Sequence, residues 1–302
     1  MTEMQRDIMR FANGHGVSIV IPAKNESMTI GSVVAELIGL YPDAEVIVVD
    51  DGSTDGTAAD AYTNGAKVIS HPYSKGNGAA IKTGARAALG EVIVFMDGDG
   101  QHQPADVALL LEKYSEGYEM VVGARVGRKS QAGMHRAFAN GFYNKIASWM
   151  TGCKVLDLTS GFRVANARHF QRFLYLLPNG FSYPTTITMA FFRSGYSVAY
   201  LPVDVMQRTN LGGSHIRIWR DGVRFLLIIF KIGTLFSPLK LYLPISLVFF
   251  ATGLSYYAYT YLSSGRFTNM SALLFITSVL IFLIGLVSEQ ITALMYREDK
   301  EN

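Results

Sequence analysis

Continuous apolar runs separated by helical patterns fill the first half of the chain. The runs are rich in β-branched and aliphatic residues and have the length of strands, at 17–22, 45–51, 67–70, 92–96 and 119–125. Between them, apolar residues recur with a helical period at 28–40, 75–89 and 105–115. This alternation predicts an α/β domain with an open, mostly parallel sheet that helices cover on both faces.

The second half of the chain carries longer apolar stretches. The run 241–262 is almost uncharged, and Glu289 alone interrupts 271–296, so each exceeds the roughly 20 residues that cross a bilayer. Before them, 217–237 combines arginines with aromatic and aliphatic residues, which predicts a helix in the membrane interface. Basic residues flank the outer ends of the two runs, which predicts a multi-pass protein of the cell membrane with both termini cytoplasmic.

These patterns divide the chain into four parts. An N-terminal extension covers 1–16, and it lacks the apolar core of a signal peptide. A cytoplasmic domain follows at 17–212, then an interfacial region at 213–238. Two transmembrane helices and a short cytoplasmic tail occupy 239–302. Glu289 lies inside the second helix, where it either reaches the cytoplasmic interface or pairs within an oligomer, and we favour pairing.

Polar residues gather where the predicted strands end. In open parallel sheets, ligands bind beyond the carboxyl ends of the strands. The residues at these ends are Asn25, Glu26, Asp50, Asp51, His71, Asp97, Asp99 and Arg125. The pattern therefore predicts a functional site at this edge of the sheet.

The most informative strand end is Asp97-Gly98-Asp99-Gly100, directly after the run 92–96. Unpaired carboxylates are costly to bury, and the glycines permit a tight turn with close backbone approach. Carboxylate oxygens suit a hard divalent cation such as Mg²⁺ or Mn²⁺, with Gln101 as a candidate third ligand. A D-x-D triplet alone is common, but its place between a strand and a helical pattern predicts a metal-assisted site.

A glycine-rich segment at 75–84 invites comparison with phosphate-binding motifs. It departs from G-x-G-x-x-G at the last position, and no G-x-x-x-x-G-K-[ST] occurs in the chain. The sequence therefore argues against a dinucleotide dehydrogenase and a P-loop NTPase. Two interpretations stay open, namely a helix start with small residues for close packing, and a phosphate-binding helix start.

The net charge and the number of cysteines bear on the partner and on the cellular compartment. The formal net charge of +3 gives no indication of a nucleic-acid partner. Cys153 is the single cysteine, so no intrachain disulfide can form, which fits a reducing compartment.

An α/β domain with D-x-D after a strand has the parts that a nucleotide-sugar transferase needs. A cation at Asp97 and Asp99 would neutralise the charge that develops on the diphosphate leaving group. Asp51 is a candidate acceptor of hydrogen bonds from the base of the nucleotide. Asn25 and Glu26 are candidates for contacts to the base or the ribose. Glu26 has the alternative of capping the helix that follows it.

Several motifs together resemble a known family. The segments IVIPAKNE, VIVVDDGSTDGT, FMDGDGQHQP, VGAR and DLTSGFR look like family 2 glycosyltransferases of the GT-A fold. Among these, the chain is similar to polyprenyl-phosphate glycosyltransferases, which include dolichyl-phosphate mannose synthases. The resemblance implies inverting transfer of one sugar from a nucleotide sugar to undecaprenyl or dolichyl phosphate. It also points to a homo-oligomer, with a tetramer as one candidate form.

The resemblance assigns site residues by position. Those implied for the nucleotide sugar are Pro22, Ala23, Asn25, Glu26, Asp51, Lys75, Asp97 and Gly98, and those for the metal are Asp97, Asp99 and Gln101. Those implied for the acceptor phosphate are Arg125, Arg136, Arg208, Ser214 and His215. The family often has R-x-x-G-x-S-K, whereas this chain reads RTNLGGSHIR, so His215 or Arg217 would take the basic role of that lysine.

The catalytic residues are expected to be Asp99 and Asp157. Asp157, in LDLTSGFR, either orients the acceptor and takes its proton, or caps a turn beside Thr159 and Ser160. A lipid phosphate is largely dianionic at pH 7, so it needs arginines for orientation more than it needs a strong base. Arg163 is expected at the surface or in a structural ion pair.

The sequence leaves the donor open. UDP-glucose is the first choice, because the DLTSGFR and GGSH segments look like those of bacterial lipid-phosphate glucosyl enzymes. A GDP-mannose-using dolichyl-phosphate mannose synthase is the alternative enzyme. A membrane-anchored nucleotide-sugar-binding protein without turnover is the alternative from another class.

Overall fold

The computed structural model describes residues 11, 14–125, 134–180, 183–204, 230–231 and 233–295, without the side chains of 134–140, 142 and 143. The predicted interfacial region falls largely outside these residues, as do Arg208, Ser214, His215 and the side chain of Arg136. The chain forms two compact units. The first contains residues 1–148 and 153–213, and the second contains 149–152 and 214–302.

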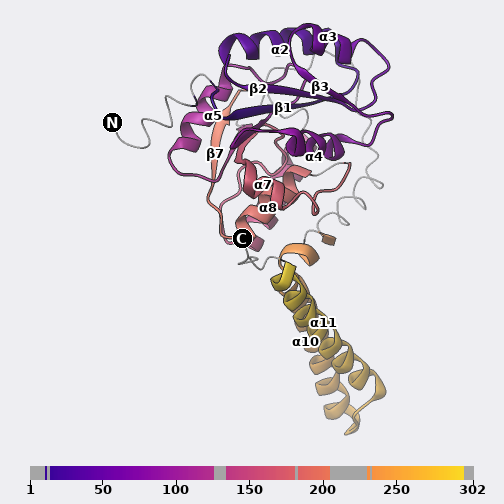
Figure 1. Cartoon of the computed structure of the whole chain (residues 1–302). Helices are drawn as coiled ribbons and strands as arrows, with labels where there is room; N and C mark the ends of the chain where they lie inside the picture. Colours follow the sequence, from indigo (N-terminus) through magenta and orange to yellow (C-terminus); the bar gives the residue numbers. More distant parts are fainter. Residues whose placement is uncertain are drawn as a thin grey trace. The chain divides into compact units, whose positions relative to one another are not determined.

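A seven-stranded sheet in the order β3-β2-β1-β4-β6-β5-β7 forms the centre of the first unit (Figure 1). Strands β1 to β4 pair in parallel, as predicted, and β5 pairs in parallel with β7. Strand β6 runs antiparallel between β4 and β5. The strands are β1 Val17–Ala23, β2 Glu45–Asp50, β3 Lys67–Ser70, β4 Val92–Phe95, β5 Met120–Arg125, β6 Arg163–Asn166 and β7 Val198–Val203.

The core explains why the apolar runs become strands. Every residue of β1 and β4 is buried, because helices cover both faces of the sheet. The sequence patterns did not predict β6, which is four residues long and begins with an arginine. They did not predict β7 either, because this edge strand is only partly buried.

Helices pack on both faces of the sheet. Figure 1 shows α2 and α3 on one side of β1 and β2, and α4 on the other. Helix α2 buries Ile30, Val33, Val34 and Leu37, the i, i+3, i+4, i+7 stripe of an amphipathic helix. The helices of this unit are α2 Ser27–Leu40, α3 Thr57–Thr63, α4 Asn77–Ala87, α5 Asp106–Ser115, α6 Met134–Thr151 as far as Ser148, α7 Ala167–Arg172 and α8 Tyr183–Arg193.

The second unit is built on a hairpin of α10 (Pro238–Ser264) and α11 (Asn269–Met295), each 27 residues long and apolar enough to cross a membrane. Their seam consists of small residues seven positions apart, which are Ser246, Gly253 and Thr260 in α10 and Ser271, Ser278, Gly285 and Thr292 in α11. Ser246 and Ser278 each donate a hydrogen bond of 2.9 Å to the other's carbonyl oxygen. Large apolar side chains point outward, so the pair is packed as membrane helices are.

Polar contacts close one end of this hairpin. The Glu289 carboxylate accepts a hydrogen bond of 3.2 Å from the Leu239 N–H, in the first turn of α10. A carboxylate there satisfies a free N–H group and faces the positive end of the helix dipole. Glu289 therefore has a partner within its own chain, which the hypothesis of pairing in an oligomer did not include. In the same unit, Lys240 Nζ donates to the Met150 carbonyl oxygen at the end of α6 (2.9 Å).

Candidate active site at the carboxyl edge of the sheet

A cavity of about 390 Å³ lies beyond the carboxyl ends of β1, β2 and β4, beside the start of α4. Its lining includes four carboxylates and one lysine. The lining residues are Pro22, Ala23, Lys24, Glu26, Asp51, Ser74, Gly76, Asn77, Ala80, Asp97, Gly98 and Asp99. The predicted edge of the sheet is therefore hollow, and the predicted acidic residues converge on it.

Asp51 holds the loop that leads into α4. Its Oδ1 accepts a hydrogen bond from Lys75 N (2.8 Å) and lies 2.7 Å from His71 Nδ1. Its Oδ2 accepts from Ser74 Oγ (2.7 Å) and Gly76 N (2.9 Å). Burial opposes ionisation, but these hydrogen bonds outweigh it and lower the pKa of Asp51 to about 2. Asp51 is thus an ionised anchor for one wall of the cavity.

The loop after β1 is shaped by Asn25 and Glu26. Asn25 has a φ of 55°, a left-handed conformation that asparagine tolerates. Its Oδ1 accepts a hydrogen bond from Thr54 N (2.9 Å), which ties this loop to the one after β2. Glu26 occupies the N-cap position of α2 without a side-chain capping hydrogen bond, and its side chain lines the cavity.

The glycine-rich segment packs against a neighbouring loop. The N–H of Ala79 donates to the Asn179 carbonyl oxygen (2.9 Å), and that of Gly78 to the Gly180 carbonyl oxygen (3.3 Å). A Cβ at Gly78 would lie 2.0 Å from the Pro178 carbonyl oxygen. The close-packing interpretation therefore holds at Gly78 and Ala79, because the N–H groups of these two residues already have protein partners.

The two carboxylates of the D-x-D turn line the cavity and are partly exposed. Asp99 Oδ1 accepts a hydrogen bond from Gln101 N (3.1 Å), and the Gly98 carbonyl oxygen accepts one from Thr29 Oγ1 (2.9 Å). Gly161 leaves room for Asp97, since a Cβ at that glycine would lie 2.9 Å from Asp97 Oδ2. Among the described residues, no group of three or more His, Cys, Asp or Glu side chains could hold a metal ion. A metal here would rest on two carboxylates.

His102 lies next to this turn and is buried. Its ring stacks on Phe162 with 4.8 Å between centroids, and its Nδ1 has no hydrogen-bond partner. Burial lowers the pKa of His102 to about 4, although the charges of Asp99 and Asp157 act in the opposite direction. The imidazole is therefore neutral near pH 7.

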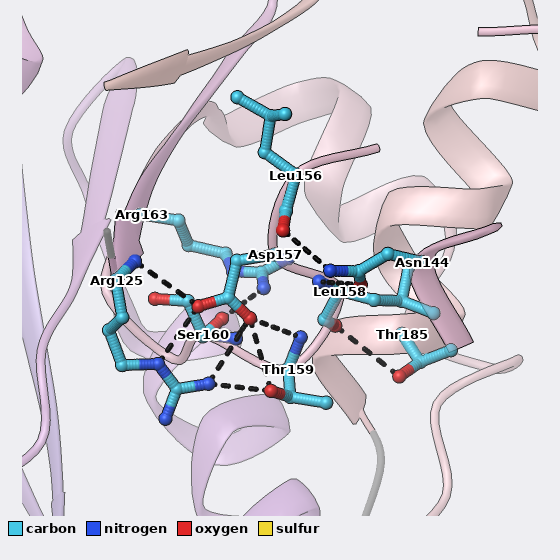
Figure 2. Close-up of polar contacts among 9 residues, drawn as sticks. All are labelled: Arg125, Asn144, Leu156, Asp157, Leu158, Thr159, Ser160, Arg163 and Thr185. Carbon is cyan, nitrogen blue, oxygen red and sulfur yellow. Dashed lines mark hydrogen bonds and ion pairs between the residues drawn. The ribbon is translucent and has the colours of Figure 1, made fainter. Parts of the chain in front are cut away.

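A second polar cluster surrounds Asp157 (Figure 2). Arg125, the last residue of β5, donates from Nε to Asp157 Oδ2 (2.8 Å) and from Nη2 to Oδ1 (3.1 Å). Asp157 Oδ1 also accepts from the N–H groups of Thr159 (2.9 Å) and Ser160 (3.1 Å). Burial raises the pKa of this carboxyl, but Arg125 and the backbone donors outweigh burial, so the pKa lies below its ordinary value.

These contacts are those of the turn-capping alternative for Asp157. The carboxylate is buried, ionised and bound on both oxygens. Burial acts against the charged guanidinium of Arg125, but its bonds to Asp157 outweigh burial and raise the pKa of Arg125. The role of Asp157 as a base stays a prediction.

Arg163 corrects an expectation from the sequence. It is fully buried rather than on the surface, and no described carboxylate forms an ion pair with it. Its Nη1 donates to the Pro184 carbonyl oxygen (3.2 Å) and Thr188 Oγ1 (3.1 Å), and its Nη2 donates to the Ser160 carbonyl oxygen. Carbonyl and hydroxyl oxygens from α8 and from the turn before β6 thus replace a counter-ion.

The structure brings together most of the residues predicted for the nucleotide sugar. Asn25, Lys75 and Gln101 do not line the cavity, and Lys75 contributes its backbone N–H to Asp51 instead. Sequence reasoning missed the lining residues Lys24, Ser74, Gly76, Asn77 and Ala80. Lys24 follows β1 directly, so the rule on strand ends was sufficient to find it.

This chain is similar in sequence and in structure to several known transferases. The glycosyltransferase AglJ of Haloferax volcanii is 27% identical over 293 residues, which cover 92% of this chain and 94% of that protein. The polyprenol monophosphomannose synthase of Mycolicibacterium smegmatis is 27% identical, covering 66% of this chain and 82% of that protein. The structure of glucosyl-3-phosphoglycerate synthase from Mycobacterium tuberculosis with Mn²⁺, UDP-glucose and phosphoglyceric acid superposes with a TM-score of 0.58. It is 25% identical and covers 77% of this chain and 83% of that one.

Two family models match the chain. The model of the GtrB C-terminal hairpin matches residues 237–294, which contain α10 and α11. The model of glycosyl transferase family 2 matches residues 18–173, more than half of the chain, including β1 to β6 and the D-x-D turn. This protein therefore belongs to glycosyl transferase family 2 and is a glycosyltransferase with a GT-A-like core.

Proposed function

We propose that this enzyme transfers one sugar from a nucleotide-diphosphate sugar to a polyprenyl phosphate at a membrane surface. The observation that carries the proposal is the cavity with the D-x-D carboxylates, in a chain that ends in two helices of membrane length. The names of relatives support the acceptor class, because one of them is a polyprenol monophosphomannose synthase.

The residues of the cavity fit a divalent cation. Mg²⁺ is usually held by one or two carboxylates together with substrate phosphates, and Asp97 and Asp99 supply two. Bound there, Mg²⁺ or Mn²⁺ would compensate the negative charge of the departing diphosphate. Mn²⁺ in the related glucosyl-3-phosphoglycerate synthase supports this assignment. Gln101 stays a candidate third ligand.

The chain's own residues bind the donor. Asp51 fixes the loop 74–76, which forms one wall, and Asn25 ties the loop after β1 to the loop after β2. Lys24 Nζ donates a hydrogen bond to Ser74 Oγ (2.9 Å) in the loop 74–76. The ammonium group of Lys24 therefore stands at the rim of the cavity, where we place the donor's phosphates or base. We assign the nucleoside to the part of the cavity near Pro22, Ala23 and Asp51.

The acceptor phosphate is already a nucleophile, since its second pKa is near 6. One of its oxygens attacks the anomeric carbon, the bond from that carbon to the diphosphate oxygen breaks, and the nucleoside diphosphate leaves. Arg125 has the positive charge to hold such a phosphate on the part of its guanidinium that Asp157 and Thr159 do not occupy, and Asp157 fixes its orientation. We retain Arg136, Arg208, Ser214 and His215 as further acceptor contacts on the strength of the sequence resemblance.

For the donor we propose UDP-glucose. The superposed synthase that binds UDP-glucose supports this choice, whereas the name of the mannose synthase relative favours GDP-mannose as the alternative. The proposed topology is a cell-membrane protein with the catalytic domain and both termini cytoplasmic, in accord with the basic residues that flank the hairpin.

A donor panel tests this proposal. Purified protein in detergent receives polyprenyl phosphate, Mn²⁺ or Mg²⁺, and one radiolabelled nucleotide sugar at a time, and the lipid product is extracted. We expect label in the lipid with UDP-glucose and its loss in Asp99→Asn. A folded protein that binds UDP-glucose but labels no lipid with any common donor would instead be a binding protein, and the proposal would be lost.

A further inference from the structure

The side chain of Asn144 forms hydrogen bonds to the backbone on both sides of Asp157 (Figure 2). From α6, its Nδ2 donates to the Leu156 carbonyl oxygen (2.5 Å), and its Oδ1 accepts from the Leu158 N–H (3.1 Å). A residue on a parallel strand makes the same pair of bonds to the two neighbours of the residue it faces. One carboxamide therefore replaces a strand on this side of Asp157.

Neighbouring contacts restrict the same turn further. Ser148, one helical turn after Asn144, accepts a hydrogen bond from Val155 N (2.9 Å). From α8, Thr185 Oγ1 donates to the Leu158 carbonyl oxygen (3.3 Å). With the backbone held from two helices, the Asp157 side chain is directed toward Arg125, as Figure 2 shows.

Asp157 in turn fixes the guanidinium of Arg125. Two of the guanidinium's nitrogens bond the carboxylate, and Nη2 also reaches Thr159 Oγ1 (2.5 Å). A continuous series of contacts thus runs from Asn144 through the backbone at 156–158 and the Asp157 carboxylate to Arg125. Asn144 itself does not line the donor cavity.

We propose that Asn144 is a positioning residue for the acceptor phosphate, acting through Asp157 on Arg125. This inference rests on the proposed function, because Arg125 is the residue assigned to the lipid phosphate. A fixed guanidinium loses little freedom when phosphate binds, whereas a loose one must be ordered each time. Loss of the carboxamide should therefore weaken use of the acceptor and leave the donor cavity, which belongs to other loops, unaffected.

Steady-state kinetics of Asn144→Ala test the proposal, with the concentrations of polyprenyl phosphate and nucleotide sugar varied separately. We expect kcat/KM for the lipid to fall about tenfold, with KM for the nucleotide sugar changed less than about twofold. Lys145→Gln, at the exposed neighbouring position, serves as the matched control and should behave as the wild type. Asn144→Asp replaces the alanine variant if that one does not fold, since it keeps the volume and the acceptor but not the donor.

A double-mutant cycle separates positioning from general stabilisation. In an Arg125→Ala background, Asn144→Ala should have no further effect on kcat/KM for the lipid, because the residue through which it acts is gone. Independent, additive losses would overturn the proposal, as would an equal loss toward donor and acceptor. If the wild type labels no lipid at all, the proposed function fails first. If the wild type is active and Asn144→Ala is unchanged, only this inference fails.

Discussion

Asp157→Asn probes the most connected side chain of the acceptor cluster. Within the described part of the chain, the Asp157 carboxylate accepts hydrogen bonds from Arg125, Thr159 and Ser160. An ionised carboxylate has only acceptors, whereas an amide places an NH₂ group where one of its oxygens was. The substitution keeps the shape, so its effect measures charge and acceptor capacity.

The expected loss of stability depends on the hydrogen bonds that each oxygen of the Asp157 carboxylate accepts. If the amide oxygen takes the place of Oδ1, the bonds to Oδ2 from Arg125 Nε (2.8 Å) and Arg125 N (3.3 Å) are lost, and donors face each other. A hydrogen bond to a charged group contributes roughly 1.5–3 kcal/mol, and a donor left unsatisfied costs a further 1 kcal/mol or more. Because Arg125 is about a third exposed, water offsets part of this. We expect a loss of about 2–4 kcal/mol in the free energy of unfolding.

Thermal unfolding of the detergent-solubilised protein, followed by circular dichroism, measures this loss. A domain of this size should melt roughly 5–15 °C lower. The pKa of Asp157 is lower in the folded protein than the ordinary carboxyl value of about 3.9, which applies to the unfolded chain. The stability that the ionised Asp157 contributes is therefore fully present above about pH 3.9, and it is lost as the pH falls through the pKa of the folded state. The variant should lack this acid-dependent component. An unchanged melting temperature together with a large fall in kcat alone would refute the reasoning and favour a general base.

Two further substitutions test packing. Gly78→Ala places a Cβ 2.0 Å from the Pro178 carbonyl oxygen and should destabilise the first unit by about 2–4 kcal/mol, measured by melting. Gly141→Ala, with open space around it in α6, is its control and should be neutral or stabilising. Ser278→Leu should force the hairpin helices apart and lower the thermal stability of the second unit, whereas Val279→Leu, on the exposed face, should not. Equal melting of either variant and its control would contradict the packing described.

The sequence predicted the features that depend on local pattern. Continuous apolar runs become β1 to β5, and β1, β2, β4 and β5 are almost wholly buried, as expected of strands that helices cover on both faces, whereas β3 at the edge of the sheet is not. The site followed from one rule, that ligands bind where such strands end, and Asp51, Asp97 and Asp99 do meet in one cavity.

Features that depend on tertiary contacts were not predictable in this way. An arginine at the start of a short segment gives no sign that its guanidinium will be fully buried, as Arg163 is, because its partners are oxygens from other elements. The role of the glycines at the start of α4 depended on the loop at 178–180, which lies about a hundred residues away in the sequence. Asn144 looks like any polar helix residue until the turn around Asp157 packs against it.

The charge of the donor cavity makes the cation and the nucleotide depend on each other. Of the charged residues that line it, Glu26, Asp51, Asp97 and Asp99 are acidic and Lys24 is basic. The pKa of Asp51, about 2, keeps that residue ionised in the working range of pH. A nucleotide diphosphate would therefore enter a cavity that carries negative charge like its own, at a cost in free energy that a divalent cation on Asp97 and Asp99 removes.

By linkage, UDP must then raise the affinity for Mn²⁺ by the same factor by which Mn²⁺ raises the affinity for UDP. Calorimetric titration of UDP with Mn²⁺ and with EDTA should show at least about tenfold tighter binding with the metal, and Asp97→Asn should reduce this difference. Equal UDP affinity in EDTA would mean that the carboxylates do not act through a cation.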